Sequence, residues 1–285
     1  MIGYQWPAMK SFDDKVAAIT GAASGIGRAL ALALGRRNCR LALSDVDEEG
    51  LRETVDQVSG LGARVTAQRV DVANREAVYA WADRVADDHG KVHLIFNNAG
   101  VALGSTVEKM SYGDFEWLMD VNFWGVVHGT KAFLPHLKAS GDGHIVNISS
   151  VFGLAGIPSQ SAYNSAKFAV RGFTESLRQE LDMLGYGVSA PCVPPGGIKT
   201  GIARSARMDS SISDLGISDI DTREKFEKTF ITSAEKAADA ILEGVQRNQR
   251  RVLVGPDARV FDWVVRLLPS TYQRIAVGYS RFSAK

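Results

Sequence analysis

Ser150, Tyr163 and Lys167 have the side-chain types and the spacing to exchange a proton with a carbonyl or alcohol oxygen. Tyr163 and Lys167 stand four residues apart in a segment with helical apolar periodicity, so one helix face should carry both. Since a neighbouring cation favours the phenolate, we expect the pKa of Tyr163 to fall below its ordinary value of about 10. Ser150 follows the predicted strand of residues 145–149 and can meet the phenol. Alone, each residue is better explained as a turn cap, a core-edge phenol or a solvated lysine.

A glycine-rich loop between a predicted strand and a predicted helix gives a second chemical signal. Residues 16–20 form a short apolar run typical of a strand buried in a parallel sheet, and residues 28–34 are good helix formers. Between them, Gly21, Gly25 and Gly27 have the spacing Gly-x-x-x-Gly-x-Gly. Glycines let the backbone approach a pyrophosphate, and a helix N-terminus attracts its charge. The order predicts a dinucleotide site, although a tight turn without a ligand has the same pattern.

Asp45 is the residue that would select the cofactor. It ends the predicted strand of residues 40–45, 18 residues after Gly27, close to the separation at which an acid meets the adenosine ribose. A carboxylate there accepts hydrogen bonds from the ribose hydroxyls and repels a 2′-phosphate, so we predict NAD over NADP. Arg28 and Arg40 are the nearby bases that oppose this prediction. A solvated Asp at a strand end is the alternative.

Strand and helix patterns alternate along the chain, which is typical of a parallel α/β fold. Further strands are predicted over residues 64–70, 92–96, 188–193 and 251–255, and further helices over residues 74–89, 111–136 and 234–245. The amides of residues 97–98 end one of these strands, and we expect Asn97 to have a structural role there. No internal repeat, low-complexity stretch or linker is visible, so residues 1–285 are predicted to form one domain.

Composition excludes several classes of function. The 33 Lys and Arg residues nearly balance the 32 Asp and Glu residues, which does not favour nucleic acid. Cys39 and Cys192 belong to no Cys-x-x-Cys pair and the histidines form no His-Glu-x-x-His motif, so we predict no disulfide framework and no metal site. With no secretion signal in residues 1–11 and no apolar run long enough to span a membrane, we expect a cytoplasmic protein that binds small molecules.

Two segments leave alternatives open. Residues 201–230 are mostly polar with scattered apolar side chains, and form either a lid over an apolar substrate or a covering helix pair. Residues 256–285 are predicted to be a helical tail, and residues 250–285 hold six Arg and one Lys against Asp257 and Asp262. Basic and aromatic residues together suit an anionic membrane surface. A subunit contact or a solvated terminal helix is favoured over that membrane contact.

Taken together, these motifs resemble the short-chain dehydrogenase/reductase family over residues 15–200, with weaker agreement beyond. The shared features, in family order, are Thr20-Gly21-x-x-x-Gly25-x-Gly27, Asn97-Asn98-Ala99-Gly100, Ser150 thirteen residues before Tyr163, Tyr163-x-x-x-Lys167 and Pro195-Gly196. The resemblance implies a Rossmann-like, doubly wound parallel sheet in three α/β/α layers and a nicotinamide cofactor. It also implies a catalytic tetrad of Asn122, Ser150, Tyr163 and Lys167.

The resemblance also implies roles. Ser150 would hydrogen-bond the substrate oxygen, Tyr163 would exchange a proton with it, and Lys167 would hold the nicotinamide ribose. Asn122 would keep its helix kinked so that a water links Lys167 to solvent. The implied cofactor contacts are Gly21, Ser24, Gly25, Ile26, Gly27, Asp45, Asp71, Val72, Asn98, Gly100, Tyr163, Lys167, Pro195, Gly196, Ile198 and Thr200. Pro194 departs from the polar residue usual in the family and removes an amide donor.

The first functional hypothesis is an NAD(H)-dependent oxidoreductase that interconverts a secondary alcohol and a ketone. The long tail resembles members that act on bulky lipophilic substrates. Two alternatives remain: an NADP-dependent reductase of ketoacyl thioesters, and a non-catalytic dinucleotide-sensing protein of the same fold. Members of the family commonly pair through the helices that here begin near Ser111 and Ala162, so we expect a homodimer or homotetramer.

Overall fold

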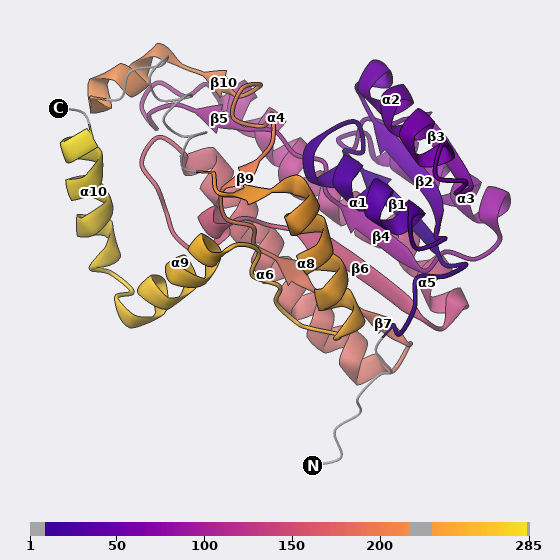
Figure 1. The fold of residues 1–285 in the computed structure, drawn as a ribbon. Helices are drawn as coiled ribbons and strands as arrows, with labels where there is room; N and C mark the ends of the chain where they lie inside the picture. The colour runs from indigo at the N-terminus through magenta and orange to yellow at the C-terminus, as the bar shows by residue number, and fades with distance from the viewer. Residues whose placement is uncertain (1–8, 217–229, 284–285) are drawn as a thin grey trace.

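A parallel sheet lies at the centre of the computed structural model, which describes residues 9–216 and 230–283 (Figure 1). Its strands are β1 (Val16–Thr20), β2 (Arg40–Asp45), β3 (Val65–Arg69), β4 (Leu94–Asn97), β6 (Gly143–Ile148), β7 (Val188–Ser189) and β8 (Cys192–Val193). Their order is β3-β2-β1-β4-β6-β7, with β8 also paired to β6. The order reverses between β1 and β4, and open α/β sheets bind ligands beyond the carboxyl ends of the strands at such a point.

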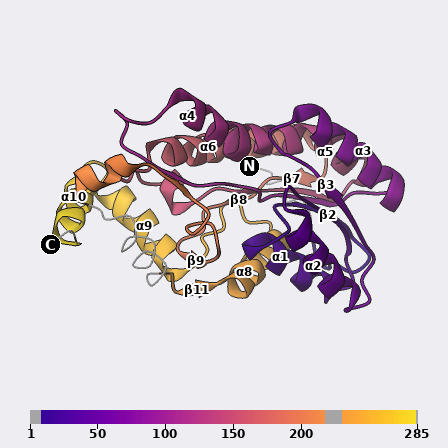
Figure 2. The ribbon, with the colours of Figure 1, turned by 90° about the horizontal axis from the view of Figure 1, so that it is seen from above.

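Helices cover both faces of the sheet (Figure 2). On one side lie α1 (Gly25–Gly35), α2 (Glu48–Ser59) and α8 (Ala234–Gln246). On the other lie α3 (Arg75–His89), α4 (Tyr112–Met119), α5 (Gly125–Ser140) and α6 (Ser161–Leu184). This arrangement confirms the three-layer, doubly wound fold.

Each face of the sheet has its own hydrophobic core. On the α1 side, Ile19 of β1 packs with Leu30 of α1 and Ile241 of α8, and all three side chains are fully buried. On the α3 side, the rings of Trp81 and Phe133 meet edge to face with centroids 5.1 Å apart. Because both faces of β1 are covered, its residues read as a continuous apolar run rather than an alternating one.

The carboxyl-terminal strands are less regular than the sequence predicts. The strand expected over residues 188–193 divides into β7 and β8, because Pro191 between them has no amide to donate. The strand expected over residues 251–255 is wrong in its continuity: only isolated bridges join Arg251 to Cys192 and Val254 to Pro195. Prolines at positions 194 and 195 remove the amide donors that a full ladder there would need.

The described parts of the segment after residue 200 form short strands and a 3₁₀ turn. Up to residue 216, β10 (Arg207–Met208) pairs with β5 (Leu103–Gly104), and a 3₁₀ turn follows over Ser210–Leu215. β11 (Thr232–Ser233) then pairs with β9 (Ile198–Lys199). Residues 217–229 lie outside the described residues, so a covering role for the whole segment stays a prediction.

The tail is helical, as expected. It consists of α9 (Pro256–Leu267) and α10 (Tyr272–Ser283), which form the end of the molecule beyond the start of α6 (Figures 1 and 2). Within residues 9–216 and 230–283, every helix is too short or too polar to cross a membrane.

Candidate active site

The glycine loop lies against the end of β4, where no side chain would fit. Gly21 has a φ of +66°, and a Cβ built on it would lie 2.7 Å from the Ala99 Cα. A Cβ on Gly27 would overlap the carbonyl oxygen of Gly21. The carboxamide of Asn98 fastens the loop by donating to the carbonyl oxygens of Thr20 and Gly21, at 2.9 and 3.1 Å. The glycines are therefore needed for the close approach of two strand ends.

The N-terminus of α1 opens beside this loop. Its N-cap residue, Ser24, makes no side-chain cap hydrogen bond, and the first turn holds no acidic residue. The first-turn amides, which include those of Ile26 and Gly27, have no carbonyl partner within the helix. Thr200 reaches the same place, because a Cβ on Gly25 would lie 3.0 Å from its Cγ2. The structure thus brings together Ser24, the loop and Thr200, which are far apart in sequence.

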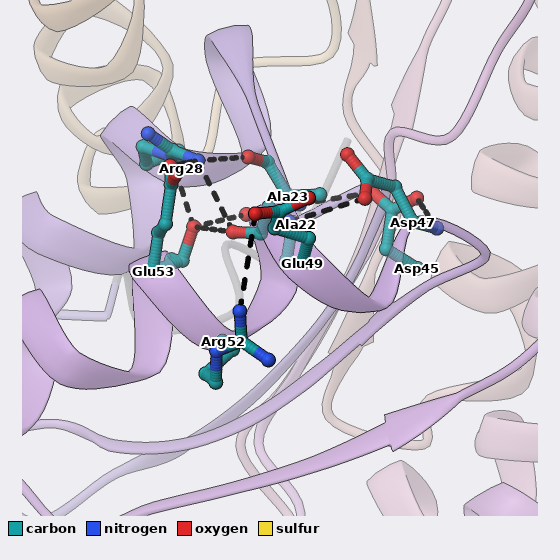
Figure 3. A network of polar contacts seen from close by, with 10 residues as sticks. Ala22, Ala23, Arg28, Asp45, Asp47, Glu49, Arg52 and Glu53 are labelled. Atoms are coloured by element: carbon teal, nitrogen blue, oxygen red, sulfur yellow. Dashed lines mark hydrogen bonds and ion pairs between the residues drawn. The ribbon is translucent and has the colours of Figure 1, made fainter.

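Asp45 points at the glycine loop from the end of β2 (Figure 3). Its Oδ2 accepts from the Ala23 amide at 2.9 Å, and its Oδ1 accepts from the Asp47 amide at 3.0 Å. An ionised carboxylate has about four acceptor positions, so further donors can still bind both oxygens. Asp45 is therefore fixed by the loop rather than merely solvated.

Neither of the bases that opposed the NAD prediction is free to bind a phosphate. Arg28 donates to the carbonyl oxygens of Ala23 and Gly50 and to Glu53 Oε2, in the network of Figure 3. Arg40 begins the strand that Asp45 ends, and there it pairs with Asp14 at 3.1 Å. Arg28 is thus committed to holding the loop, and Arg40 lies at the opposite edge of the sheet.

The other predicted cofactor contacts lie along the same carboxyl edge. Asp71 follows β3 and accepts from the Ala73 amide at 3.0 Å. The Val72 side chain is buried and lies close to Gly125 of α5. A Cβ built on Gly125 would be 2.8 Å from Val72 Cγ2. Ile198 is buried in β9. Of this group, only Asp71 has an exposed side chain.

Asn97 has the structural role that the sequence predicted. Its carboxamide donates to Asn147 Oδ1 at 2.8 Å, and Asn147 in turn donates to Thr174 Oγ1 of α6 at 3.0 Å. All three side chains are buried. This chain of hydrogen bonds ties β4 and β6 to the helix that carries Tyr163 and Lys167.

Asn122 lies in a π-helical turn, Asp120–Trp124, between α4 and α5. The side chain is fully buried, and its carboxamide both accepts from and donates to the Val101 backbone at 2.8 Å. The kink implied by the family resemblance is therefore present. A Cβ on Gly100 would lie 3.2 Å from Asn122 Oδ1 and 3.7 Å from Lys167 Nζ, so these three residues converge.

Ser150 and Tyr163 meet as the sequence predicts. The Ser150 hydroxyl interacts with the Tyr163 phenol and favours the phenolate. Ser150 also caps the 3₁₀ turn Val151–Gly153 by accepting from the Phe152 amide at 3.1 Å. The Phe152 ring packs edge to face on Tyr163, with centroids 6.0 Å apart. The turn-cap alternative and the chemical role of Ser150 are thus compatible.

Lys167 is buried rather than solvated. Only 3% of it is exposed, and its Nζ donates to the Ile148 carbonyl oxygen at 3.1 Å. Burial disfavours the ammonium and lowers the pKa of Lys167 to about 8. Its Nζ lies 5.6 Å from the centre of the Tyr163 ring.

The predicted direction of the Tyr163 shift is wrong in this structure. Burial raises the pKa of Tyr163 to about 12 and outweighs the opposing hydrogen bond from Ser150. The sequence argument omitted the cost of removing a phenolate from water, which here is the largest influence on the pKa of Tyr163. Tyr163 is therefore a protonated donor at neutral pH.

Comparison with known proteins identifies the family of this chain. A family model described as short chain dehydrogenase matches residues 15–211. The chain belongs to the short-chain dehydrogenase/reductase family. It is an oxidoreductase.

Relatives resemble the chain over nearly its whole length. It is 52% identical to SadH of Mycobacterium tuberculosis over 280 residues, 96% of this chain and 98% of that protein. It is 35% identical to a C alpha-dehydrogenase of Sphingobium, over 88% of this chain and 84% of that one. The crystal structure of a short-chain dehydrogenase/reductase from Burkholderia phymatum in complex with NAD matches with a TM-score of 0.85 and 35% identity, over 93% of this chain and 96% of that chain.

The Pro194 departure from the short-chain dehydrogenase/reductase pattern does not leave its loop unsupported. The Gly196 amide donates to the Val254 carbonyl oxygen at 2.9 Å, and the Pro195 carbonyl oxygen accepts from the Val151 amide at 2.9 Å. Asp257, in the first turn of α9, accepts from the Gly197 amide at 2.6 Å. The tail and its preceding segment therefore hold this loop by accepting from the Gly196 and Gly197 amides, although Pro194 has no amide to donate.

Three positioning residues escaped the sequence analysis of this family member. Asn164 donates to the carbonyl oxygens of Phe152 and Ala155 and accepts from the Ile157 amide, which ties the serine loop to α6. Tyr272 of α10 accepts from the Gly156 amide of that loop at 3.1 Å, and Asp257 holds the cofactor loop. An amide directly after the tyrosine was a usable signal for Asn164. Nothing local marks Asp257 or Tyr272, whose partners are distant in sequence.

Proposed function

We propose that the protein is an NAD(H)-dependent oxidoreductase that interconverts a secondary alcohol and a ketone, with Tyr163 as general acid and base. The observation that carries the proposal is the interaction of the Ser150 hydroxyl with the Tyr163 phenol, with buried Lys167 on the same helix. Two hydroxyls at one point can bind a single carbonyl oxygen from two directions. A helix N-terminus with free amides lies at the same edge of the sheet.

The chain's own residues would act on the substrate oxygen as follows. Ser150 donates a hydrogen bond that polarises the carbonyl, and Tyr163 donates its proton as the oxygen gains negative charge. In the oxidative direction Tyr163 must first lose its proton, which burial of the phenol opposes. General acid–base catalysis of this kind supplies about 10²- to 10⁴-fold in rate.

The residues present fit a dinucleotide. The glycine loop lies flush against β4, the first turn of α1 has neither a side-chain cap nor an acid, and Asp45 borders both. Gly21 to Gly27 would hold the pyrophosphate, Asp45 the adenosine ribose and Lys167 the nicotinamide ribose. When bound, the nicotinamide supplies the hydride acceptor or donor. Asp71, Val72, Asn98, Gly100, Pro195, Gly196, Ile198 and Thr200 remain proposed contacts.

Three observations support NAD over NADP. The related Burkholderia enzyme forms a complex with NAD. Asp45 places a carboxylate against the loop through Oδ2, which disfavours a second anion there. The nearby arginines are paired internally, Arg28 with Glu53 at 2.8 Å and Arg69 with Glu48 at 3.5 Å. Tighter binding of NADPH than of NADH to the wild type would overturn the choice and favour the ketoacyl-thioester reductase.

Tyr163→Phe is the direct test of the chemistry. It removes the hydroxyl and keeps the ring packed against Phe152, so we expect NADH to bind, by fluorescence titration, while alcohol and ketone turnover falls at least 10²-fold. Unchanged turnover in this variant would refute the assignment of Tyr163. No turnover of a broad alcohol and ketone panel by the wild type, with NADH still bound, would favour the dinucleotide-sensing alternative.

The proposal also covers the oligomeric state of the protein and its location in the cell. We propose a homodimer or homotetramer that pairs through α4, α5 and α6, where the exposed apolar side chains include Tyr112, Trp124 and Phe168. A monomer in sedimentation velocity would contradict this. We also expect a cytoplasmic location, since Cys39 and Cys192 are both free and buried. Cell fractionation that finds the protein outside the cytoplasmic compartment would overturn it.

The substrate is expected to be lipophilic. The tail contacts the serine loop through Tyr272, so it borders the space where a substrate must lie. Comparing kcat/KM along a series of secondary alcohols of increasing chain length tests this. A preference for the smallest alcohols would contradict it.

A further inference from the structure

An apolar stripe runs along α9 on the side away from the protein. Val260, Trp263 and Leu267 are 60%, 67% and 69% exposed, and their spacing of three and four residues puts them on one helix face. We call these three residues the tail stripe. Exposed apolar patches on a helix mark contacts with proteins or membranes.

The opposite face of α9 is the one that packs on the body of the protein. Ala258 there is fully buried, Asp257 binds the Gly197 amide, and Asp262 binds Arg251 at 2.9 Å. In the tail stripe, Val260 lies two residues after Ala258, and Leu267 lies five residues after Asp262. Either spacing places the two side chains on roughly opposite sides of the helix. The anchored face therefore fixes the stripe in an outward orientation.

The charges beside the stripe are cationic. Arg259 and Arg266 are seven residues apart and flank the stripe on one side, and Arg274 is exposed on α10. Both acidic side chains of the described tail already have partners within the protein. Asp257 accepts from the Gly197 amide, and Asp262 pairs with Arg251 and Arg266. Arg259 and Arg274 pair with no acid that the structure describes.

We propose that the tail stripe and its flanking arginines dock the protein on an anionic lipid surface. Amphipathic helices that lie in a membrane interface have this composition, with Trp and Leu on one face and Arg beside it. Anionic headgroups complement Arg259 and Arg274. A second copy of the same face does not, because it offers arginines and no free carboxylate. The proposal does not depend on the proposed reaction.

Vesicle sedimentation tests the docking. The wild type is expected to sediment with vesicles of phosphatidylcholine and phosphatidylglycerol, and far less with phosphatidylcholine alone. Raising the ionic strength from about 0.1 M to about 1 M shortens the screening length from about 10 Å to about 3 Å and should release it. Absence of binding to the anionic vesicles would overturn the proposal.

Matched variants separate the two contributions. Arg259→Gln with Arg274→Gln should lower partitioning about thirtyfold, since each basic residue near the surface is worth about 1 kcal/mol. Trp263→Ser with Leu267→Ser should lower it about tenfold or more. The control pair, Leu61→Ser with Val107→Ser, removes exposed apolar side chains elsewhere and should bind as the wild type does.

Two further measurements show whether the tail variants still fold. Thermal melting and NADH titration should be unchanged in both tail variants, which shows that they fold. Equal loss of binding in the control pair would overturn the proposal. So would tail variants that still bind vesicles normally, or that change the sedimentation coefficient without vesicles, since the latter would assign the stripe to a second copy.

Discussion

The cofactor side and the substrate side of the site are held in place by different kinds of contact. On the cofactor side, the loop at Gly21 is fixed by Asp45 and Arg28, whose partners lie at most 26 residues away, and by Asn98 at the end of β4, 77 residues from Gly21. On the substrate side, Gly156 is held by Tyr272, 116 residues away, and the tail also holds Gly197, next to the proposed cofactor contacts Pro195 and Gly196, through Asp257, 60 residues away. The first βαβ unit supplies most of the first half and Asn98 after β4 closes it, whereas the second half depends on a tail that must return across the molecule.

This difference explains where specificity can change. The cofactor half consists of backbone-to-backbone approaches that admit no side chains, as at Gly21 and Gly27. The substrate half is held by single hydrogen bonds from a helical hairpin at the edge of the fold. Substitutions in the first half should therefore either abolish cofactor binding or leave it unchanged. Substitutions in the second half should change substrate turnover gradually.

Breaking the cofactor half should have the largest effect. Gly27→Ala places a methyl group on the Gly21 carbonyl, so we expect NADH binding to be lost and the melting temperature to fall. Gly172→Ala on α6 is the matched control, because nothing lies within 4 Å of its Cβ position. It should stabilise the protein by about 0.5–1 kcal/mol. Normal NADH binding by Gly27→Ala would show that the loop is not close-packed.

Acid should weaken the sheet that both halves share. Burial lowers the pKa of His93 and His144 to about 4, below the ordinary value of 6.5. The folded state thus keeps both neutral while the unfolded chain takes up protons. Their contribution to stability is fully present above pH 6.5 and is lost as the pH falls through about 4. Denaturant melts from pH 7 to pH 4 check this, and a stability independent of pH would contradict it.

A substitution of Asp45 tests whether this carboxylate selects the cofactor. Asp45→Ser removes the carboxylate next to the Ala23 amide, so NADH should bind about tenfold more weakly and NADPH more tightly. Glu49→Gln, in the first turn of α2, controls for the change in local charge and should alter neither dissociation constant appreciably. An unchanged ratio of NADH to NADPH affinity in Asp45→Ser would remove Asp45 from cofactor selection.

The smallest effect is expected on the substrate side. Tyr272→Phe deletes one hydrogen bond to Gly156, worth about 0.5–1.5 kcal/mol, so KM for the alcohol should rise about threefold to tenfold. The dissociation constant of NADH should not move, because the glycine loop is untouched. Tyr112→Phe, on a phenol that is 89% exposed, is the control. A change in NADH affinity with Tyr272→Phe would show that the two halves are coupled.

The predictable parts of this protein are those with local signals. Apolar runs gave β1, β2 and β4, and the helical spacing of Tyr163 and Lys167 placed both on α6. The strand expected over residues 251–255 failed because ladder continuity depends on the amide donors of the neighbouring chain, which Pro194 and Pro195 lack. A run of apolar residues carries no information about its partner strand.

Sequence alone determined the fold class and the residue types at the site, since periodicity and glycine spacing follow from backbone geometry. Tertiary structure decided the pKa of Tyr163, because desolvation depends on everything packed round the phenol and not on its neighbour four residues away. It also decided that Asp257 and Tyr272 hold the active-site loops. Contacts between residues so distant along the chain exist only once the chain has folded.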